Sequence, residues 1–160
     1  MKRPVNVVLG TCVLSVAAFA VQAGEAPRPE YGPDITIEQA KKIATATLAE
    51  CAANKWNVAV AVVNTHGSLV YYERMNNTQS ASAQIAVDKA KVGAMYRRTT
   101  RVFADVIAKA GPAVMTLPGV VASPGGVPIM SGGRVIGGVG VSGVTGDQDE
   151  QCAMAGLKAM

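Results

Sequence analysis

The hydrophobic and polar positions along the chain predict helices and hairpins in the order helix, hairpin, helix, helix, hairpin, helix. The first helix is expected to begin at Thr36, because Thr36 and Gln39 have the spacing of a capping box. Apolar residues then recur at helical spacing, at Ile37, Ala40, Ala44, Leu48 and Cys51. One face of this helix should therefore be buried.

Two pairs of short apolar runs predict the hairpins. Residues 57–64 are β-branched and apolar on both faces, which is typical of a central strand covered on both sides. A turn at 65–68 then leads into a second strand at 69–75. The second hairpin joins 127–131 to 134–142 through Gly132-Gly133, since both glycines can adopt the positive φ of a two-residue turn.

Three further helices complete the pattern. One runs from Ser80 or Ser82 to Arg97, and Thr99 or Thr100 caps a shorter one that ends near residue 109. Asp147 can cap the last helix, whose inner stripe is Cys152, Ala153, Gly156, Leu157 and Met160. Two hairpins with few long crossovers imply an α+β fold, with an antiparallel sheet of four or five strands and helices on its faces.

Glycines at 137, 138, 140 and 143 interrupt the last predicted strand. Small residues let a strand pack tightly against helices, which is the preferred interpretation. The alternative is an anion site, in which the loop through Gly146 delivers a ligand to the free amides of the last helix. Asp147, Asp149 and Glu150 occupy that same turn and would repel an anion.

The N-terminus predicts export. Lys2 and Arg3 precede a mostly apolar run at 5–20, and 21–23 has the small-x-small form that signal peptidase accepts. A membrane anchor is the competing interpretation, but about 16 apolar-biased residues are few for a spanning helix. We therefore expect a signal peptide at 1–23, an extended proline-containing leader at 24–34, and one domain at 35–160. The mature protein should be periplasmic or secreted.

Composition argues against nucleic acid as a partner. The chain has 15 Lys and Arg against 11 Asp and Glu, and removal of Lys2 and Arg3 with the signal leaves 13 against 11, a net charge of +2. Aromatic residues are only 4% of the chain, too few for a surface that stacks bases. A weakly charged exported protein lacks the electrostatic footprint of a nucleic-acid binder.

Cleavage also removes Cys12 and leaves Cys51 and Cys152 on the inner stripes of the first and last helices. These two residues can form a disulfide, remain reduced and buried, or bridge subunits. The sequence contains no CxxC and only one histidine, which excludes a Cys-rich metal site. That histidine, His66, lies in the first hairpin turn, where polar residues are ordinary; ligation of haem iron or a metal is the alternative.

Charged residues gather at two places. A basic cluster contains Lys89, Lys91, Arg97, Arg98 and Arg101, with Tyr96 inside it and Phe103 just beyond. It fits helix capping and solubility, or recognition of carboxylates or phosphates by arginine. We expect Asp88 and Lys89 to form a solvated ion pair. The acidic group at Asp147, Asp149 and Glu150 fits the start of a helix better than a metal site.

Several segments together resemble the GlcG/HbpS family, which is often called haem-binding. The resemblance is colinear from about residue 35 to 160, and it is carried by 37–44, 58–64, 72–75, 88–91, 96–100, 124–129, 140–143 and 147–150. It implies a profilin-like α+β fold, with a central antiparallel sheet of about five strands flanked by helices. It also implies homo-oligomers, with octamers known in the family.

The resemblance implies a non-enzymatic protein that binds haem or a related tetrapyrrole, with roles in iron or redox sensing and a membrane sensor as partner. Thr100 aligns with a haem-contacting threonine, Arg97 and Arg98 would meet the propionates, and Tyr96 and Phe103 would line the ring. Other members occur in glycolate-utilisation contexts, so the alternative is an accessory protein or enzyme for a small carboxylate, hydroxy acid or its aldehyde. His66 replaces the small residue that the family often has in the first hairpin turn.

Overall fold

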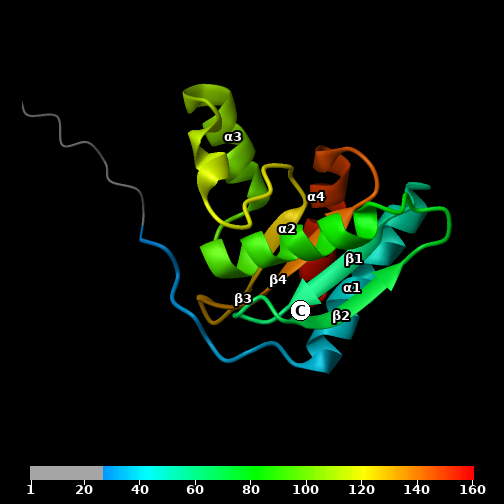
Figure 1. Cartoon of the computed structure of the whole chain (residues 1–160). Coiled ribbons are helices and arrows are strands. Elements are labelled where there is room, and N and C mark those ends of the chain that lie inside the picture. The colour runs from blue at the N-terminus through cyan, green and yellow to red at the C-terminus, as the bar shows by residue number, and fades with distance from the viewer. Residues whose placement is uncertain (1–26) are drawn as a thin grey trace, which may run out of the picture.

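The computed structural model describes residues 27–160, and the predicted signal peptide at 1–23 lies outside the described residues. Figure 1 shows helices on both faces of one sheet. The elements in chain order are α1 (Ile37–Ala53), β1 (Ala59–Val63), β2 (Leu69–Arg74), α2 (Ser82–Tyr96), α3 (Thr100–Ala110), the short 3₁₀ helix η1 (Pro112–Thr116), β3 (Gly126–Ser131), β4 (Arg134–Ser142) and α4 (Gly146–Leu157). This order matches the predicted one, apart from η1, which was not predicted.

The sheet has the strand order β2-β1-β4-β3, and every neighbouring pair is antiparallel. The α+β fold is therefore confirmed, but the sheet within the described residues has four strands and not five. A segment of the predicted leader lies beside the start of β4, where Tyr31 forms a single parallel bridge with Val135. Pro29 and Pro33 flank this bridge and have no backbone N–H to donate, which prevents a longer strand.

Helices α1 and α4 cover one face of the sheet, behind it in Figure 1. The main core lies between them and the strands and includes Ile43, Val60, Val62, Val139 and Val141, all fully buried. Cys51 of α1 and Cys152 of α4 form a disulfide in this core, with their Cα atoms 5.7 Å apart. The bond joins the two helices side by side.

Helix α2 covers the opposite face and packs directly on the backbone of β4. A Cβ atom on Gly138 would lie 2.2 Å from the Ala90 carbonyl oxygen, and one on Gly140 would lie 2.0 Å from that of Ala86. Only glycine fits at these two positions because the helix backbone occupies the space of a side chain. The expectation that the strand glycines serve tight helix packing is confirmed at positions 138 and 140, whereas Gly137 and Gly143 lie against the backbone of Val63 and Asn57.

Local capping explains where two helices begin. Thr36 and Gln39 form the predicted capping box at α1, with the Gln39 N–H 3.3 Å from the Thr36 hydroxyl oxygen. Helix α4 begins at Gly146 with Thr145 as its N-cap, and not with Asp147 as predicted, because Thr145 and Gln148 form a second capping box. Within residues 27–160, no helix is long and apolar enough to cross a membrane.

Candidate binding cleft and cationic corner

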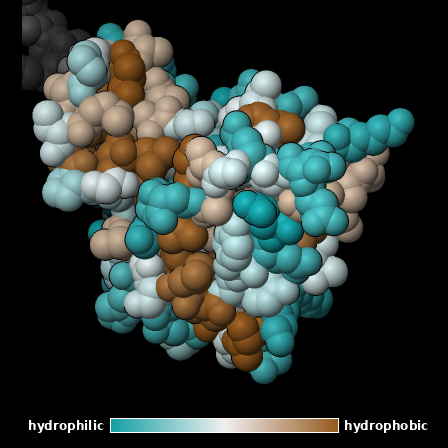
Figure 2. Space-filling model, turned by 45° about the vertical axis from the view of Figure 1, so that its right-hand side comes forward, coloured by the Kyte–Doolittle hydropathy of each residue, from teal (hydrophilic) through white to brown (hydrophobic). Residues whose placement is uncertain are grey.

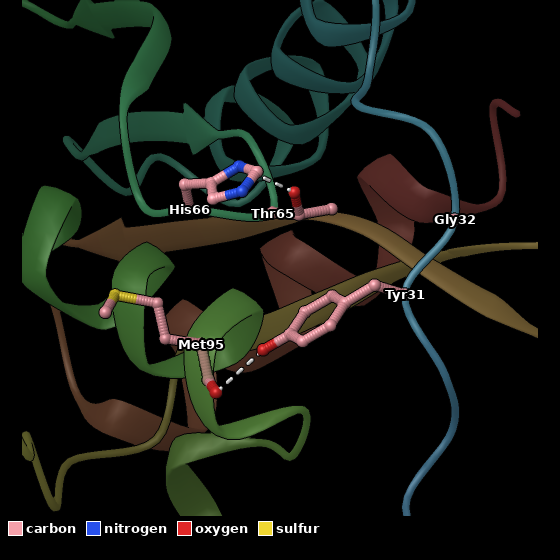
Figure 3. Close-up of a pocket in the computed structure, with 5 residues that line it drawn as sticks. All are labelled: Tyr31, Gly32, Thr65, His66 and Met95. Atoms are coloured by element: carbon pink, nitrogen blue, oxygen red, sulfur yellow. Dashed lines mark hydrogen bonds between the residues drawn. The ribbon is translucent and has the colours of Figure 1, made fainter.

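Two adjacent hollows lie at the turn between β1 and β2. The first has a volume of about 410 Å³ and is lined by Tyr31, Gly32, Thr65, His66 and Met95 (Figure 3). Figure 3 shows the His66 imidazole on one side of this hollow and the Tyr31 ring on the other. The Tyr31 hydroxyl donates a hydrogen bond to the Met95 carbonyl oxygen at 2.9 Å, which fixes the tyrosine against the end of α2.

The second hollow has a volume of about 420 Å³ and shares His66 and Met95 with the first. Its other lining residues are Gly67, Asp88, Lys91, Val92, Pro118 and Gly119. We call the two hollows together the His66 cleft. Each volume falls within the range of roughly 300–1,000 Å³ that small-molecule sites occupy.

A short hydrogen-bond chain orients His66. Its Nδ1 atom lies 3.1 Å from the Thr65 hydroxyl oxygen, and that hydroxyl donates to Asp34. The Thr65 backbone N–H also donates to Asp34, at 3.0 Å. The two hydrogen bonds from Thr65 lower the pKa of the Asp34 carboxyl below its ordinary value. Asn64 braces the turn, because its side-chain oxygen accepts the backbone N–H groups of His66 and Ser68.

The residues that the resemblance assigns to haem contact lie where α2 ends and α3 begins, and we call them the cationic corner: Tyr96, Arg97, Arg98, Thr100 and Phe103. Arg97 has a left-handed backbone with φ of 56°, which ends α2 and turns the chain into α3. Its Nη1 atom donates to the Pro29 carbonyl oxygen at 3.1 Å, and its guanidinium lies 5.1 Å from the centre of the Tyr31 ring. Because Tyr31 lines the first hollow, Arg97 contacts a wall residue of the His66 cleft without lining the cleft itself.

Tyr96, Arg98 and Phe103 pack against one another in the same corner. The Tyr96 ring meets the Phe103 ring edge to face at 5.2 Å, and the Arg98 guanidinium lies 5.9 Å from the centre of the Phe103 ring. The Tyr96 hydroxyl donates to the Pro118 carbonyl oxygen at 2.6 Å. This bond holds Pro118, a lining residue of the second hollow, against α2.

Thr100 and Phe103 are buried in the described chain. The Thr100 hydroxyl oxygen accepts the backbone N–H of Gly126 at 2.9 Å, so it secures the start of β3. Both side chains pack against other protein atoms. Their contact with a bound haem ring stays a prediction. Tyr96, Arg97 and Arg98 are partly exposed.

The sequence interpretation of Lys89 as a solvated ion pair with Asp88 is wrong. Lys89 is fully buried, and its ammonium group donates to Asp149 at 2.8 Å and to the Val141 carbonyl oxygen at 3.1 Å. Burial raises the pKa of Asp149 although Lys89 opposes this effect. Asp88 instead lies 3.8 Å from Lys91, at the surface. One signal pointed to burial: Lys89 shares a helical stripe with the small residues Ala86 and Gly93.

Two of the three acidic residues at the start of α4, Asp147 and Glu150, form ion pairs with Arg101. Arg101 of α3 contacts the Asp147 carboxylate at 2.6 Å and that of Glu150 at 2.5 Å. These hydrogen bonds raise the pKa of Arg101 and join the first turns of α3 and α4. Asp149 faces inward, where it also accepts the Val144 N–H at 3.2 Å. Among residues 27–160, no group of three or more His, Cys, Asp or Glu is arranged to hold a metal ion.

Comparison with known proteins places this geometry in a family. GlcG of Escherichia coli K12 is 36% identical over 108 residues, which cover 68% of this chain and 81% of that protein. The crystal structure of HbpS is 30% identical with a TM-score of 0.75, covering 89% of this chain and 99% of that one. The structure of a complex of PduOC with haem has a TM-score of 0.73 at 24% identity, covering 79% and 95%, which shows a shared fold.

The family model described as "Haem degrading protein HbpS-like" matches residues 35–158. This match spans most of the chain and agrees with the resemblance to the GlcG/HbpS family that the sequence shows from about residue 35 to 160. The chain belongs to the HbpS-like family.

Proposed function

We propose that this protein is exported and binds haem or a related tetrapyrrole, which it holds without transforming it. The family description and the relatives HbpS and PduOC, the latter crystallised with haem, support this ligand class. The observation that carries the proposal is the His66 cleft. It combines an imidazole, a thioether and a cation, from His66, Met95 and Lys91, in one concave surface.

The residues of the cleft fit the chemistry of haem. A porphyrin requires an apolar slot, an axial donor atom for the iron, and cations for its propionates. Tyr31, Val92 and Met95 supply apolar surface, His66 supplies a nitrogen donor, and Lys91 supplies a cation in the wall. Arg97 and Arg98 add positive charge in the adjacent corner. Haem, when bound, supplies an iron centre for coordination and electron transfer.

Titration with haemin, followed by the Soret absorbance, tests binding. We expect a shift of the Soret band for the wild type. An Arg97→Ala/Arg98→Ala variant should bind about 5- to 30-fold more weakly, because two partly exposed charge contacts are lost. Lys41→Ala/Lys42→Ala is the matched control, since it removes two exposed cations from α1. An unchanged spectrum at saturating wild-type protein would overturn the proposal.

The same titration separates holding from degradation. In the presence of ascorbate, a Soret band that persists supports a binding protein, whereas its loss with release of iron indicates that the chain degrades haem. Small carboxylates and hydroxy acids are the competing ligand class, for which Lys91 is the candidate contact. A thermal shift at millimolar hydroxy acid, without any response to haemin, would favour that class.

We also propose that the mature chain starts after Ala23 and assembles into a homo-oligomer. Figure 2 shows hydrophobic surface over the lobe formed by α3 and η1, where Met115 and Leu117 are more than two fifths exposed. Such surface on a small domain favours contact with a second copy. Light scattering should give an oligomer, with an octamer as the expected state. Export is tested by mass spectrometry of native protein, which should give a chain that begins at Gly24. A membrane sensor as partner is tested by co-purification from the native envelope.

A further inference from the structure

We infer that His66 is the axial ligand of the haem iron, through its Nε2 atom, and that haem lies in the His66 cleft. This inference rests on the proposed function and deepens it. The cationic corner at 96–103 then acts beside the cleft, while the iron is held by the turn between β1 and β2.

Hydrogen bonding selects the tautomer of His66 that leaves Nε2 free to bind a metal. The Thr65 hydroxyl has one proton, which it donates to the Asp34 carboxylate. That oxygen can therefore only accept a hydrogen bond from His66, whose Nδ1 lies 3.1 Å away. With the proton on Nδ1, the Nε2 atom keeps a free lone pair. A ligating histidine is ordinarily held in this way, by an acceptor on its other nitrogen.

The turn presents the imidazole at a fixed place in the cleft. The His66 side chain is 81% exposed, and it lines both hollows. Its neighbour Gly67 has φ of 82°, and a Cβ there would lie 2.7 Å from the Met95 sulfur. The backbone of the turn therefore lies directly against Met95. The left-handed backbone at this position favours glycine.

The surroundings of His66 suit a flat acidic ring. Tyr31 lies across the first hollow from His66 (Figure 3). The Arg97 guanidinium lies over the Tyr31 ring, 5.1 Å from its centre. Lys91 lines the second hollow and pairs with Asp88 at 3.8 Å, a partly exposed contact that a propionate can replace. The cleft thus offers a nitrogen donor between an aromatic side and a cationic side.

His66 is the one histidine in the sequence, which makes the test unambiguous. Full-length protein purified with a histidine-free tag is loaded with haemin, and His66→Ala is compared with the wild type. We expect a changed Soret position and spin state in the variant and an affinity at least tenfold lower. Exogenous imidazole should restore the wild-type spectrum. Incorporation of ¹⁵N-histidine should shift the iron–nitrogen stretching band of the wild type in the resonance Raman spectrum.

Two further variants test the orientation of the imidazole. Thr65→Val removes the acceptor of Nδ1 and should weaken haem binding by about 10- to 100-fold while nitrogen ligation is retained. Ser68→Ala, in the same turn, is the matched control and should leave affinity unchanged. Circular dichroism confirms that each variant is folded.

The outcomes separate this inference from the proposed function. If wild type and His66→Ala bind haem with identical spectra, the axial assignment is overturned and haem binding stands. If the wild type shows no Soret shift, both fail. If imidazole does not restore the spectrum of a folded His66→Ala variant, His66 acts on the cleft in some way other than ligation, and the assignment is again overturned.

Discussion

Lys89 of α2 and Asp149 of α4 form an ion pair inside the protein, with 2.8 Å between the ammonium nitrogen and the carboxylate oxygen. Only 2% of each side chain is exposed. The pair connects the helix on one face of the sheet to a helix on the other. Gly125 makes room for it, because a Cβ there would lie 3.0 Å from the Lys89 nitrogen.

Lys89→Met should destabilise the protein strongly. The substitution leaves Asp149 buried without a cation, and loss of one partner of a buried pair costs about 3–5 kcal/mol. The free energy of unfolding from urea denaturation measures this loss. Lys89→Met/Asp149→Leu should recover part of it, because the double variant buries no unpaired charge.

Lys91→Met is the control for this prediction, since the Lys91–Asp88 pair is about two fifths exposed. An exposed pair of this kind contributes roughly 0–1 kcal/mol. A Lys89→Met variant as stable as Lys91→Met would show that the buried pair does not support the fold.

Reduction of the Cys51–Cys152 disulfide should lower the melting temperature. The bond closes a loop between residues 101 apart in sequence. On the chain-entropy model, a loop of about 100 residues corresponds to about 4.7 kcal/mol, and loss of a native disulfide ordinarily costs about 2–5 kcal/mol. Thermal melts with and without a reductant measure the effect. A Cys51→Ala/Cys152→Ala variant should melt at the reduced temperature under both conditions.

Gly140→Ala should weaken the packing of α2 on the sheet. The new Cβ would lie 2.0 Å from the Ala86 carbonyl oxygen and 2.4 Å from the Ala90 nitrogen, so the helix must move away. Overpacking of this kind costs about 1–3 kcal/mol or more. Hydrogen exchange of the α2 amides should rise together with the loss of stability.

Gly132→Asn, in the β3–β4 turn, is the control for Gly140→Ala. No atom lies within 4 Å of a Cβ at this position, and its φ of 54° is one that asparagine adopts readily. Its stability should equal or exceed that of the wild type. Equal destabilisation by both substitutions would show that close packing does not explain the glycine at 140.

Features that depend on neighbours in the sequence could be predicted. The Thr36–Gln39 capping box and the Gly132-Gly133 hairpin each depend on residues within a few positions of one another. Hydrophobic periodicity predicted the helices because each buries one face. A fifth strand was not formed, since the proline-flanked segment around Tyr31 makes only one bridge.

The ion pair and the cleft could not be predicted because they join distant segments. Lys89 and Asp149 are 60 residues apart in the sequence. No local pattern identifies the acidic residue with which a buried lysine will pair. The first hollow brings together Tyr31, His66 and Met95 from the N-terminal segment, a turn and the end of a helix. The basic residues around Tyr96 are neighbours in the sequence, whereas His66 meets Met95 only in the folded chain. A single histidine in a hairpin turn gives no local sign of this contact.

The Asp34–Thr65 contact should make stability depend on pH below neutrality. Hydrogen bonds from the Thr65 hydroxyl and backbone lower the pKa of Asp34 in the folded state below the ordinary value of 3.8. The unfolded chain therefore takes up this proton first as the pH falls. The stabilisation is fully present well above pH 3.8, the pKa of the unfolded chain. It is lost as the pH falls below 3.8 and through the lower pKa of the folded state.

Comparison of the wild type with Asp34→Asn in urea from pH 7 to pH 3 measures this effect. The wild type should keep an advantage from pH 7 to about pH 5, modest because the Asp34 carboxylate is 42% exposed. This advantage should shrink near and below about pH 4. Asp105→Asn on α3 serves as the control for loss of one exposed negative charge. An advantage that persists undiminished at pH 3 would show that the Asp34 carboxylate is not the group that Thr65 stabilises.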